Sequence, residues 1–524
     1  MVYNILVLYT GKTLCSFVKD GNKMSASKEK RVRQSKKTDM LSKRTGIENE
    51  KEKQDRKFRR NTWLVIIAVA VFAIFVLIFN SNLFYTGMPA IKINNTEYSA
   101  AEATYYYKTA YFEFTDMYGE YVQYFFSTDK PLKDQQYSEE KTWADYFEET
   151  ALESMKRVTM LCDEAEKAGF TLSQEDIDSL NASIESLRTQ IMMSGSYANL
   201  NQYFFSVYGK GCDEEVVKRC SERAYLASSY YSEVYDGFTY TDGEIENYYN
   251  EHADEYDNFN YLSCYVTAIE DEENGVDSEA AMAIAKAAAE TIAKAETQEK
   301  FKAIAADVTD SSVDTSHTSG KNLSSTYGDW FTDAARREGD TTTYEYENGG
   351  VYAFYFISRE DNNYKTINVR HILASVTKDD NGEYTDEAKA EALEKIESIY
   401  NEWLEGDATE DSFGQLAMKY TDDTGSYDTG GLYENVYKYA MVEEFNNFCF
   451  EPGRKPGDVG IVYGASSSYE GYHLIYFVGE DEELYKIQIA RNDMRSDDYN
   501  IWEEEQLSGY EFEKQFAYRF ANKV

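Results

Sequence analysis

Proline, histidine and cysteine are the scarce residues of this sequence. Its 524 residues include only 4 Pro, 4 His and 6 Cys, and no two cysteines have C-x-x-C spacing. All except Cys15 follow the long apolar segment described below, which leaves an odd number beyond it. The sequence therefore predicts no disulfide framework. With so few histidines, any that falls inside an apolar run requires a reason.

Positive charge is also scarce over most of the chain. The formal net charge is −41, yet residues 1–60 are rich in Lys and Arg, so the acidity belongs to the remainder. Phosphate repulsion makes nucleic acid a poor partner for such an acidic part, whereas basic, unfolded polypeptides suit it. The length allows three or four domains, and 42% hydrophobic residues are enough for packed cores.

The only long uncharged apolar run is "NTWLVIIAVAVFAIFVLIFNSNLFY", residues 61–85. A helix of that length can cross a hydrocarbon core of roughly 30 Å. The basic "DRKFRR" before it predicts a cytoplasmic tail, residues 1–60, and an extracytoplasmic remainder. A cleaved signal peptide is the competing interpretation, but the run exceeds a usual signal core and no A-x-A-like site follows it. We therefore expect a single-pass cell-membrane anchor.

Residues 86–257 have mostly helical patterns. Ser173 with Asp176, and Thr241 with Glu244, have the spacing of capping boxes. Aromatic residues recur at steps of three and four, and this stripe has two interpretations, a packed core or a cradle for unfolded chains. The stripe consists of Tyr107, Tyr111, Phe114, Tyr118, Tyr121 and Phe125.

The second half contains an internal repeat. "FKAIAADVTDSS" at Phe301 resembles "FGQLAMKYTDDT" at Phe413, and "GVYAFYF" at Gly350 resembles "GYHLIYF" at Gly471. Each copy contains a strand, two helices, a glycine turn and a closing strand. This order predicts two small α+β domains in tandem, residues 258–362 and 364–482.

Only the second copy has a histidine on its first strand, His371, and another on its last, His473. If these strands pair, the two imidazoles can meet, with Asp423 as a third member. Three interpretations are open: buried structural histidines, a two-His, one-carboxylate metal site, or a catalytic hydrogen-bond network. Alignment of the copies places Cys264, Ser311 and Tyr352 at the corresponding positions of the first copy, which predicts that this copy folds but is catalytically silent.

The second copy resembles the parvulin-type peptidyl-prolyl isomerases. The resemblance rests on "VRHILAS", "FGQLAMKYTDD", "GG", "MVEEF" and "GYHLIYF". The helical part, with "IKINNTEYS" and "YTDGEIENYYNEHADEY", is similar to the chaperone part of PrsA and SurA-type foldases. The resemblance implies an α+β isomerase domain that needs no cofactor or metal and acts on exported, unfolded polypeptides.

The resemblance also assigns site residues. It implies that His371, Asp423 and His473 form the catalytic group, and that the substrate proline contacts Tyr433, Met441 and Phe445. The family's "GGDLG" is here "GGLYE", so the rim of the pocket differs. The alternative is a chaperone or scaffold that binds polypeptide without catalysis.

The C-terminal segment, residues 485–524, has two interpretations. From Ser496 onward its pattern is that of an amphipathic helix, and by resemblance to the same foldases it completes the helical domain. Alternatively it is a simple terminal helix. The sequence does not predict an oligomeric state.

Overall fold

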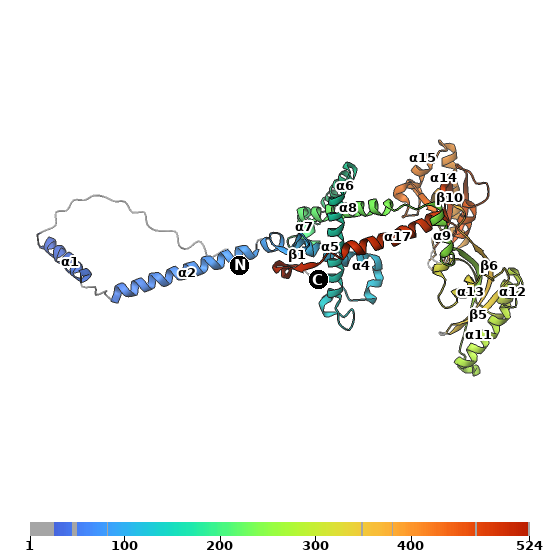
Figure 1. Ribbon diagram of the computed structural model, residues 1–524, viewed down its shortest axis with the longest axis horizontal. Coiled ribbons are helices and arrows are strands. Elements are labelled where there is room, and N and C mark those ends of the chain that lie inside the picture. The colour runs from blue at the N-terminus through green and yellow to red at the C-terminus, as the bar shows by residue number, and fades with distance from the viewer. Residues whose placement is uncertain are drawn as a thin grey trace. The chain divides into compact units, whose positions relative to one another are not determined.

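The computed structural model describes residues 26–44, 50–80, 82–346, 349–379, 381–466 and 469–521 (Figure 1). The chain divides into two compact units. Unit 1 contains residues 1–159, 173–223 and 511–524, and unit 2 contains residues 160–172 and 224–510. Helices α5 (Trp143–Ala168) and α8 (Glu214–Gly237) contribute residues to both units.

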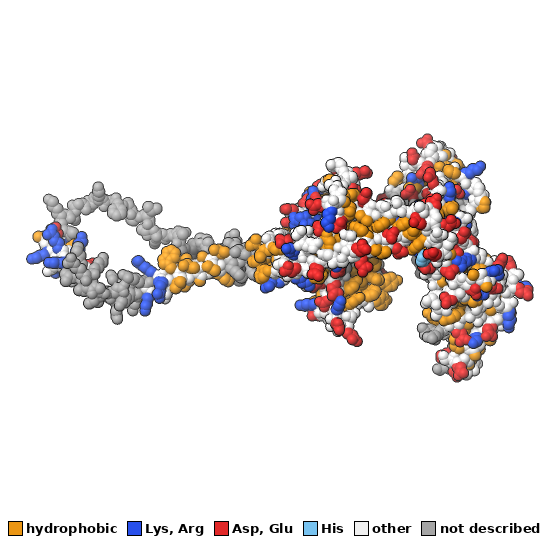
Figure 2. Space-filling model, viewed as in Figure 1, with side chains coloured by type: hydrophobic (Ala, Val, Ile, Leu, Met, Phe, Trp, Pro, Cys, Tyr) orange, Lys and Arg blue, Asp and Glu red, His pale blue; other side chains and the backbone are white. Residues whose placement is uncertain are grey.

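Three helices precede the folded part of unit 1: α1 (Ala26–Arg44), α2 (Glu50–Asn80) and α3 (Leu83–Thr86). The predicted membrane span covered residues 61–85, but α2 ends at Asn80. Exposed apolar side chains follow the basic start of α2, as Figure 2 shows. Across the described residues, no helix combines the length and the hydropathy needed to cross a membrane.

The rest of unit 1 is helical around one small antiparallel sheet. The sheet has the order β11-β1-β2, so the C-terminal strand pairs with the first strand of the unit. The predicted capping box at Ser173 and Asp176 is present at the start of α6, and a further capping box, between Ser99 and Glu102, begins α4. The remaining elements are β1 (Pro89–Ile93), β2 (Thr96–Ser99), α4 (Ala100–Tyr118), η1 (Gly119–Tyr124), η2 (Leu132–Asp134), α6 (Gln174–Ser194), α7 (Leu200–Val207), β11 (Phe512–Lys514) and η6 (Phe516–Phe520).

The aromatic stripe predicted along one helix is only partly core. Tyr107 is buried in α4, but this helix ends at Tyr118. Tyr121 and Phe125 come after the helix and are exposed. The aromatic residues keep a helical spacing beyond the end of α4, so the interpretation of the whole stripe as core is wrong.

In unit 2, hydrogen bonds from tyrosine hydroxyls to carboxylates connect three helices. They are α9 (Asp242–Glu251), α10 (Ala253–Tyr256) and α17 (Tyr485–Leu507). Tyr248 donates to Asp497 at 2.7 Å, and Tyr256 donates to Asp493 at 2.8 Å. The predicted capping box at Thr241 begins α9. Of the C-terminal segment, α17 therefore belongs to unit 2, whereas β11 belongs to unit 1.

Unit 2 also contains two four-stranded antiparallel sheets of the same design. Their orders are β4-β3-β6-β5 and β8-β7-β10-β9, which correspond strand for strand. The first copy contains β3 (Asn258–Thr267), α11 (Ser278–Ile292), α12 (Gln298–Val308), β4 (Val313–Ser319), α13 (Gly328–Thr332), β5 (Thr341–Tyr346) and β6 (Gly350–Glu360). The second contains β7 (Lys365–Ser375), α14 (Asp386–Glu405), α15 (Glu410–Tyr420), β8 (Leu432–Val436), α16 (Glu443–Cys449), β9 (Val459–Ala465) and β10 (Glu470–Leu484).

Each copy has two further strands and one short helix that the sequence pattern did not predict. The edge strands are partly exposed, and β4 has the polar sequence VDTSHTS, which lacks the apolar alternation of a half-buried strand. In both copies two longer helices cover one face of the sheet. The opposite face packs against the short helix, α13 or α16.

Candidate active site

The two histidines of the second copy lie on its central strands. In the β7–β10 ladder His371 is opposite Ile475 and His473 is opposite Leu373, so the histidines are diagonal neighbours on one face. Their Nδ1 atoms are 3.3 Å apart, and the rings are inclined by 23° at a centroid distance of 5.5 Å. Both side chains are buried. The structure thus brings the two imidazoles into direct contact.

Asp423 lies three residues after the end of α15 and faces His371. Its Oδ2 is 2.9 Å from His371 Nε2, and the same oxygen accepts hydrogen bonds from Ser426 and, at 3.0 Å, from Tyr433. The backbone N–H of Gly425 donates to Oδ1 at 3.1 Å. The hydrogen bond with His371 is the main cause that holds the pKa of Asp423 well below its usual range, and the Ser426 and Gly425 bonds add to it. The carboxylate is therefore an anion.

His473 is the neutral end of the group. Its burial lowers its pKa to about 3, an effect that the neighbouring His371 increases. Its Nε2 is 3.2 Å from the hydroxyl of Tyr469. His473 is therefore expected to be uncharged under physiological conditions.

One arrangement of protons satisfies the whole group with both imidazoles neutral. The hydroxyl of Tyr469 donates to His473 Nε2, and His473 Nδ1–H donates to His371 Nδ1. His371 Nε2–H then donates to Asp423. This assignment follows from the inventory of donors and acceptors on each ring. It gives a hydrogen-bonded chain that runs in one direction and ends on an anion.

An apolar wall lies beside the histidines. Phe445 of α16 is 1% exposed and meets the rings of His371 and His473 edge-on, at centroid distances of 5.7 and 5.5 Å. Met441 and Val442 pack against the same cluster and are partly exposed. Phe445 belongs to α16, whereas Met441 lies in the preceding loop, because α16 begins at Glu443.

Tyr433 contacts both His371 and Asp423. Its ring centroid is 5.2 Å from that of His371, and its hydroxyl binds Asp423. It therefore belongs to the polar chain as well as to the rim. Ser426 and Tyr469 also belong to the chain, three and four residues from their partners Asp423 and His473, and were missed because their positions form no periodic pattern in the sequence.

Two glycines allow the close packing of this site. A Cβ on Gly464 of β9 would lie 2.7 Å from Val442 Cγ2 and 3.0 Å from His473 Nε2. Gly431 has a φ of +75°, and its carbonyl accepts the backbone N–H of His371 at 2.9 Å. A side chain at Gly431 would be strained and would collide with the His371 carbonyl.

The structure corrects the alignment of the two copies by one residue. Cys264 was expected at the position of His371, but it faces α11 and α12. Ser263 pairs with Phe354 on β6 as His371 pairs with Ile475 on β10. Because strand residues alternate between faces, a shift by one residue moves a side chain to the other side of the sheet. Ser263 is therefore the counterpart of His371.

The other two correspondences agree with the strand and turn geometry. Tyr352 occupies the position of His473, paired to Tyr265 as His473 is paired to Leu373. Ser311 donates its backbone N–H to Thr309 Oγ1 at 3.2 Å, as Asp423 does to Thr421 at 3.1 Å. On this face the first copy has a cluster of aromatic rings: Tyr261, Tyr327, Phe331, Tyr352, Phe354 and Phe356.

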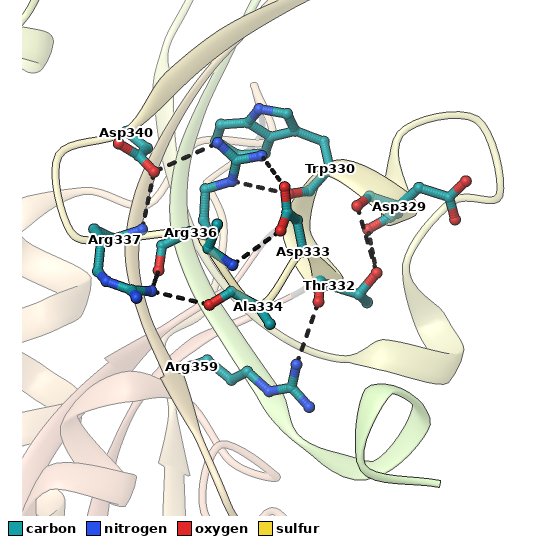
Figure 3. Close-up of polar contacts among 11 residues, drawn as sticks. Asp329, Trp330, Thr332, Asp333, Ala334, Arg336, Arg337, Asp340 and Arg359 are labelled. Atoms are coloured by element: carbon teal, nitrogen blue, oxygen red, sulfur yellow. Dashed lines mark hydrogen bonds and ion pairs between the residues drawn. The ribbon is translucent and has the colours of Figure 1, made fainter. Parts of the chain in front are cut away.

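The first copy also borders a cavity of about 720 Å³, lined by Arg336, Arg337, Arg359 and several carboxylates. Figure 3 shows the loop beside it: the Arg336 guanidinium lies 3.9 Å from the Trp330 ring centroid, and its Nε donates to the Trp330 carbonyl at 2.9 Å. Arg337 donates to two backbone carbonyls, and Arg359 binds Asp257. Each guanidinium thus already has partners in the chain, so the cavity does not indicate an anion site.

Metal binding was one interpretation of the histidine pair. Over the described residues, no group of three or more His, Cys, Asp or Glu side chains is placed to hold a metal ion. Four of the cysteines that the structure describes, Cys212, Cys220, Cys264 and Cys449, are buried free thiols.

Comparison with known proteins identifies the domain. Residues 352–480 match the family model of the PPIC-type PPIase domain. The second α+β copy is therefore a parvulin-type domain, the domain of an enzyme class that catalyses cis–trans isomerisation of peptidyl-prolyl bonds. No curated protein sequence matches the chain.

Solved structures of peptidylprolyl isomerases and foldases show similarity as well. The PrsA isomerase from Bacillus anthracis is 24% identical, with a TM-score of 0.17 over 28% of this chain and 59% of that one. The foldase PrsA from Streptococcus pneumoniae is 10% identical, with a TM-score of 0.25 over 71% and 89%. The PrsA from Bacillus cereus is 15% identical, with a TM-score of 0.17 over 56% and 85%. This chain thus spans less than two thirds of the Bacillus anthracis chain.

Proposed function

We propose that the second copy isomerises X-Pro bonds in exported, unfolded polypeptides, with His371, Asp423 and His473 as its catalytic group. The observation that carries the proposal is the buried hydrogen-bonded chain that ends on the Asp423 carboxylate beside the Phe445 wall. It lies inside the region that matches the PPIC-type domain. Met441, Phe445 and Tyr433 are the proposed contacts of the substrate proline.

The reaction requires neither a nucleophile nor a cofactor. Rotation about a prolyl amide crosses a barrier of roughly 18–20 kcal/mol, and no covalent bond breaks. An apolar wall can hold the proline ring while the preceding residue turns. Fixed polar groups can then favour the twisted amide, which has lost conjugation and has a different charge distribution from the planar form. In our proposal the neutral His473, its partner His371 and the Asp423 anion supply that fixed field.

The test is a proline-limited refolding assay with the full chain in detergent micelles. We expect acceleration above buffer at micromolar enzyme, and we expect Asp423→Asn to lower kcat/KM by about 10²-fold, the usual cost of removing one preorganised electrostatic group. Asp422→Asn is the matched control, because the neighbouring carboxylate binds Lys395 at 2.7 Å instead of the histidines. No acceleration by the wild-type chain would contradict the proposal, as would equal losses in the two variants.

A second function, client binding by unit 1, is favoured by a group of exposed apolar side chains. Met117 is 78% exposed and Tyr124 is 78% exposed, and Tyr121, Phe125 and Tyr137 are exposed as well. Such side chains suit extended, unfolded polypeptide. Aggregation of a client that lacks proline measures this function separately. Suppression by the wild type that a Tyr121→Ser, Tyr124→Ser variant loses would support it, and suppression only of proline-containing clients would contradict it.

We also propose that the chain is anchored in the cell membrane by residues 61–85, with the N-terminus in the cytoplasm. The support is the uncharged run and the basic flank before it. Retention in the membrane pellet after alkaline carbonate extraction, with protease access to unit 2 from outside, is the expected result. Release by carbonate would contradict the anchor.

A further inference from the structure

The loop that carries Met441 is held from outside its own domain. Residues 437–442 connect β8 to α16, and Tyr439 within this loop has a φ of +67°. This left-handed conformation is unfavourable for a bulky aromatic residue, so the surroundings must stabilise it. The backbone N–H of Tyr439 donates to the side chain of buried Asn446 at 2.7 Å, which ties the turn to α16 next to Phe445.

The ring of Tyr439 lies flat on a residue of the first copy. His317 of β4 stacks on it with a centroid distance of 3.9 Å and an interplanar angle of 1°. His317 is fixed in turn, because its Nδ1 is 2.6 Å from the side-chain oxygen of Asn260 on the neighbouring strand. The Asn260 amide donates to Ser358 and Glu360, so its oxygen faces the imidazole.

These bonds define the state of the His317 ring. The Asn260 oxygen can only accept, so Nδ1 of His317 carries the hydrogen and donates it. Burial lowers the pKa of His317, and burial with the nearby Glu360 carboxylate raises the pKa of Tyr439. Both changes favour the uncharged forms, so two neutral rings are stacked. The first copy thus presents a rigid, flat support to the strained turn.

Neighbouring loop residues have similar supports. Tyr437 stacks on Tyr485 of α17, with a centroid distance of 5.2 Å and an angle of 2°. The backbone N–H of Lys438 donates to the hydroxyl of Tyr364 at 3.1 Å, and its ammonium lies 4.8 Å from the centre of the same ring. Tyr437, Lys438 and Tyr439, three successive residues of the loop, therefore each contact an aromatic ring from another part of the chain.

We propose that His317 of the first copy is a positioning residue for the isomerase site: by supporting Tyr439 it fixes the loop that presents Met441 to the substrate proline beside Phe445 of α16. The inference rests on the proposed function of the second copy. It gives the first copy a role in catalysis although that copy has no histidine pair on its own face. His317 contacts neither the substrate nor His371, and acts only through the loop.

The first measurement is steady-state isomerisation of an X-Pro peptide by the full chain. His317→Ala is expected to raise KM about fivefold and to change kcat less than twofold, because the wall that holds the proline is displaced while the His371 group stays intact. His317→Phe keeps a flat ring and should restore most of the affinity. His252→Ala is the matched control, since His252 lies at the α9–α10 junction and is partly exposed.

The second measurement does not depend on activity. In the full chain labelled at methionine methyl groups, the Met441 resonance is assigned as the one lost in Met441→Leu. His317→Ala should shift or broaden it and leave Met418 unchanged, because Met418 is exposed on α15. Movement of Met441 in a chain without isomerase activity would refute the proposed function and support the positioning. An unmoved Met441, or a moved Met441 with unchanged KM in an active enzyme, would overturn the inference.

Discussion

The first copy, residues 258–362, and the second, residues 364–482, have the same strand order and the same helix-covered face, yet they differ on the opposite face. In the second copy this face has two buried histidines joined to a carboxylate. In the first copy aromatic rings occupy it, with Tyr352 in place of His473. A hydrogen-bonded polar chain of this kind can therefore be absent as a whole from a domain that keeps the same strand order. Loss of one member alone would leave a buried partner without its hydrogen bond.

Replacement of the fully buried ring beside the histidines should have the largest effect. Phe445→Ala is expected to cost the second copy about 3–5 kcal/mol of unfolding free energy, the usual range for a buried Phe, and to abolish isomerisation. Phe331→Ala removes an equally buried ring of the short helix in the first copy and should cost that copy a similar amount. Hydrogen exchange resolved by peptide measures each copy separately. A loss that spreads equally over both copies would show that they do not unfold as separate units.

Acid should have the next largest effect, and should distinguish the histidine face of the second copy from the aromatic face of the first. The folded pKa of His473 is about 3, below the value near 6.5 of an unfolded histidine, so its stabilising contribution is complete above pH 6.5 and falls as the pH drops toward 3. Between pH 6.5 and 4.5 the second copy should lose at most about 3 kcal/mol through this residue. The depressed pKa of Asp423 acts in the same direction but only below about pH 4.

The control for the acid experiment is His473→Phe, because His317 in the first copy also has a lowered pKa and contributes its own acid sensitivity. Urea unfolding of both proteins at several pH values, followed by exchange in β10, gives the comparison. A wild-type protein whose β10 protection stays level from pH 7 to 4.5 would contradict the burial of a neutral His473.

Removal of one histidine should differ in its effect on stability from joint replacement of His371, Asp423 and His473. His371→Ala removes one hydrogen-bond partner from Asp423 and leaves the buried Nδ1 of His473 without its partner, which costs about 1–3 kcal/mol. The triple change His371→Ser, Asp423→Ser, His473→Tyr gives the second copy the residues that the first copy has on its face. It should be inactive, cooperative in unfolding and less destabilised than the sum of its single changes. Strict additivity in chemical denaturation would show that the three side chains are not one network.

The sequence predicted the repeat and the histidine pair because both have local signals. Strand alternation and the rarity of histidine identified His371 and His473, and the "TDD" that follows the second helix pattern placed Asp423. The alignment of the first copy was wrong by one residue, since Cys264 and Ser263 are both small and only the strand register decides which faces the site. Ser426 and Tyr469 were missed although their partners Asp423 and His473 are only three and four residues away in the chain, because a serine in a turn and a tyrosine before a strand form no periodic pattern.

The smallest predicted effect concerns Tyr433, which has no residue of like role in the first copy. Tyr433→Phe removes one donor to Asp423 but leaves the bonds from His371 and Ser426. Because the carboxylate keeps most of its partners and Tyr433 is partly exposed, the loss of unfolding free energy should be about 1 kcal/mol. The ring itself remains, so KM for an X-Pro peptide should change less than twofold, while kcat falls a few-fold as the field of the anion changes. Tyr427→Phe, an exposed tyrosine in the same loop region, should change neither constant. If Tyr433→Phe raised KM strongly and left kcat unchanged, the hydroxyl would contact the substrate directly, and Tyr433 would belong to the rim instead of the polar chain.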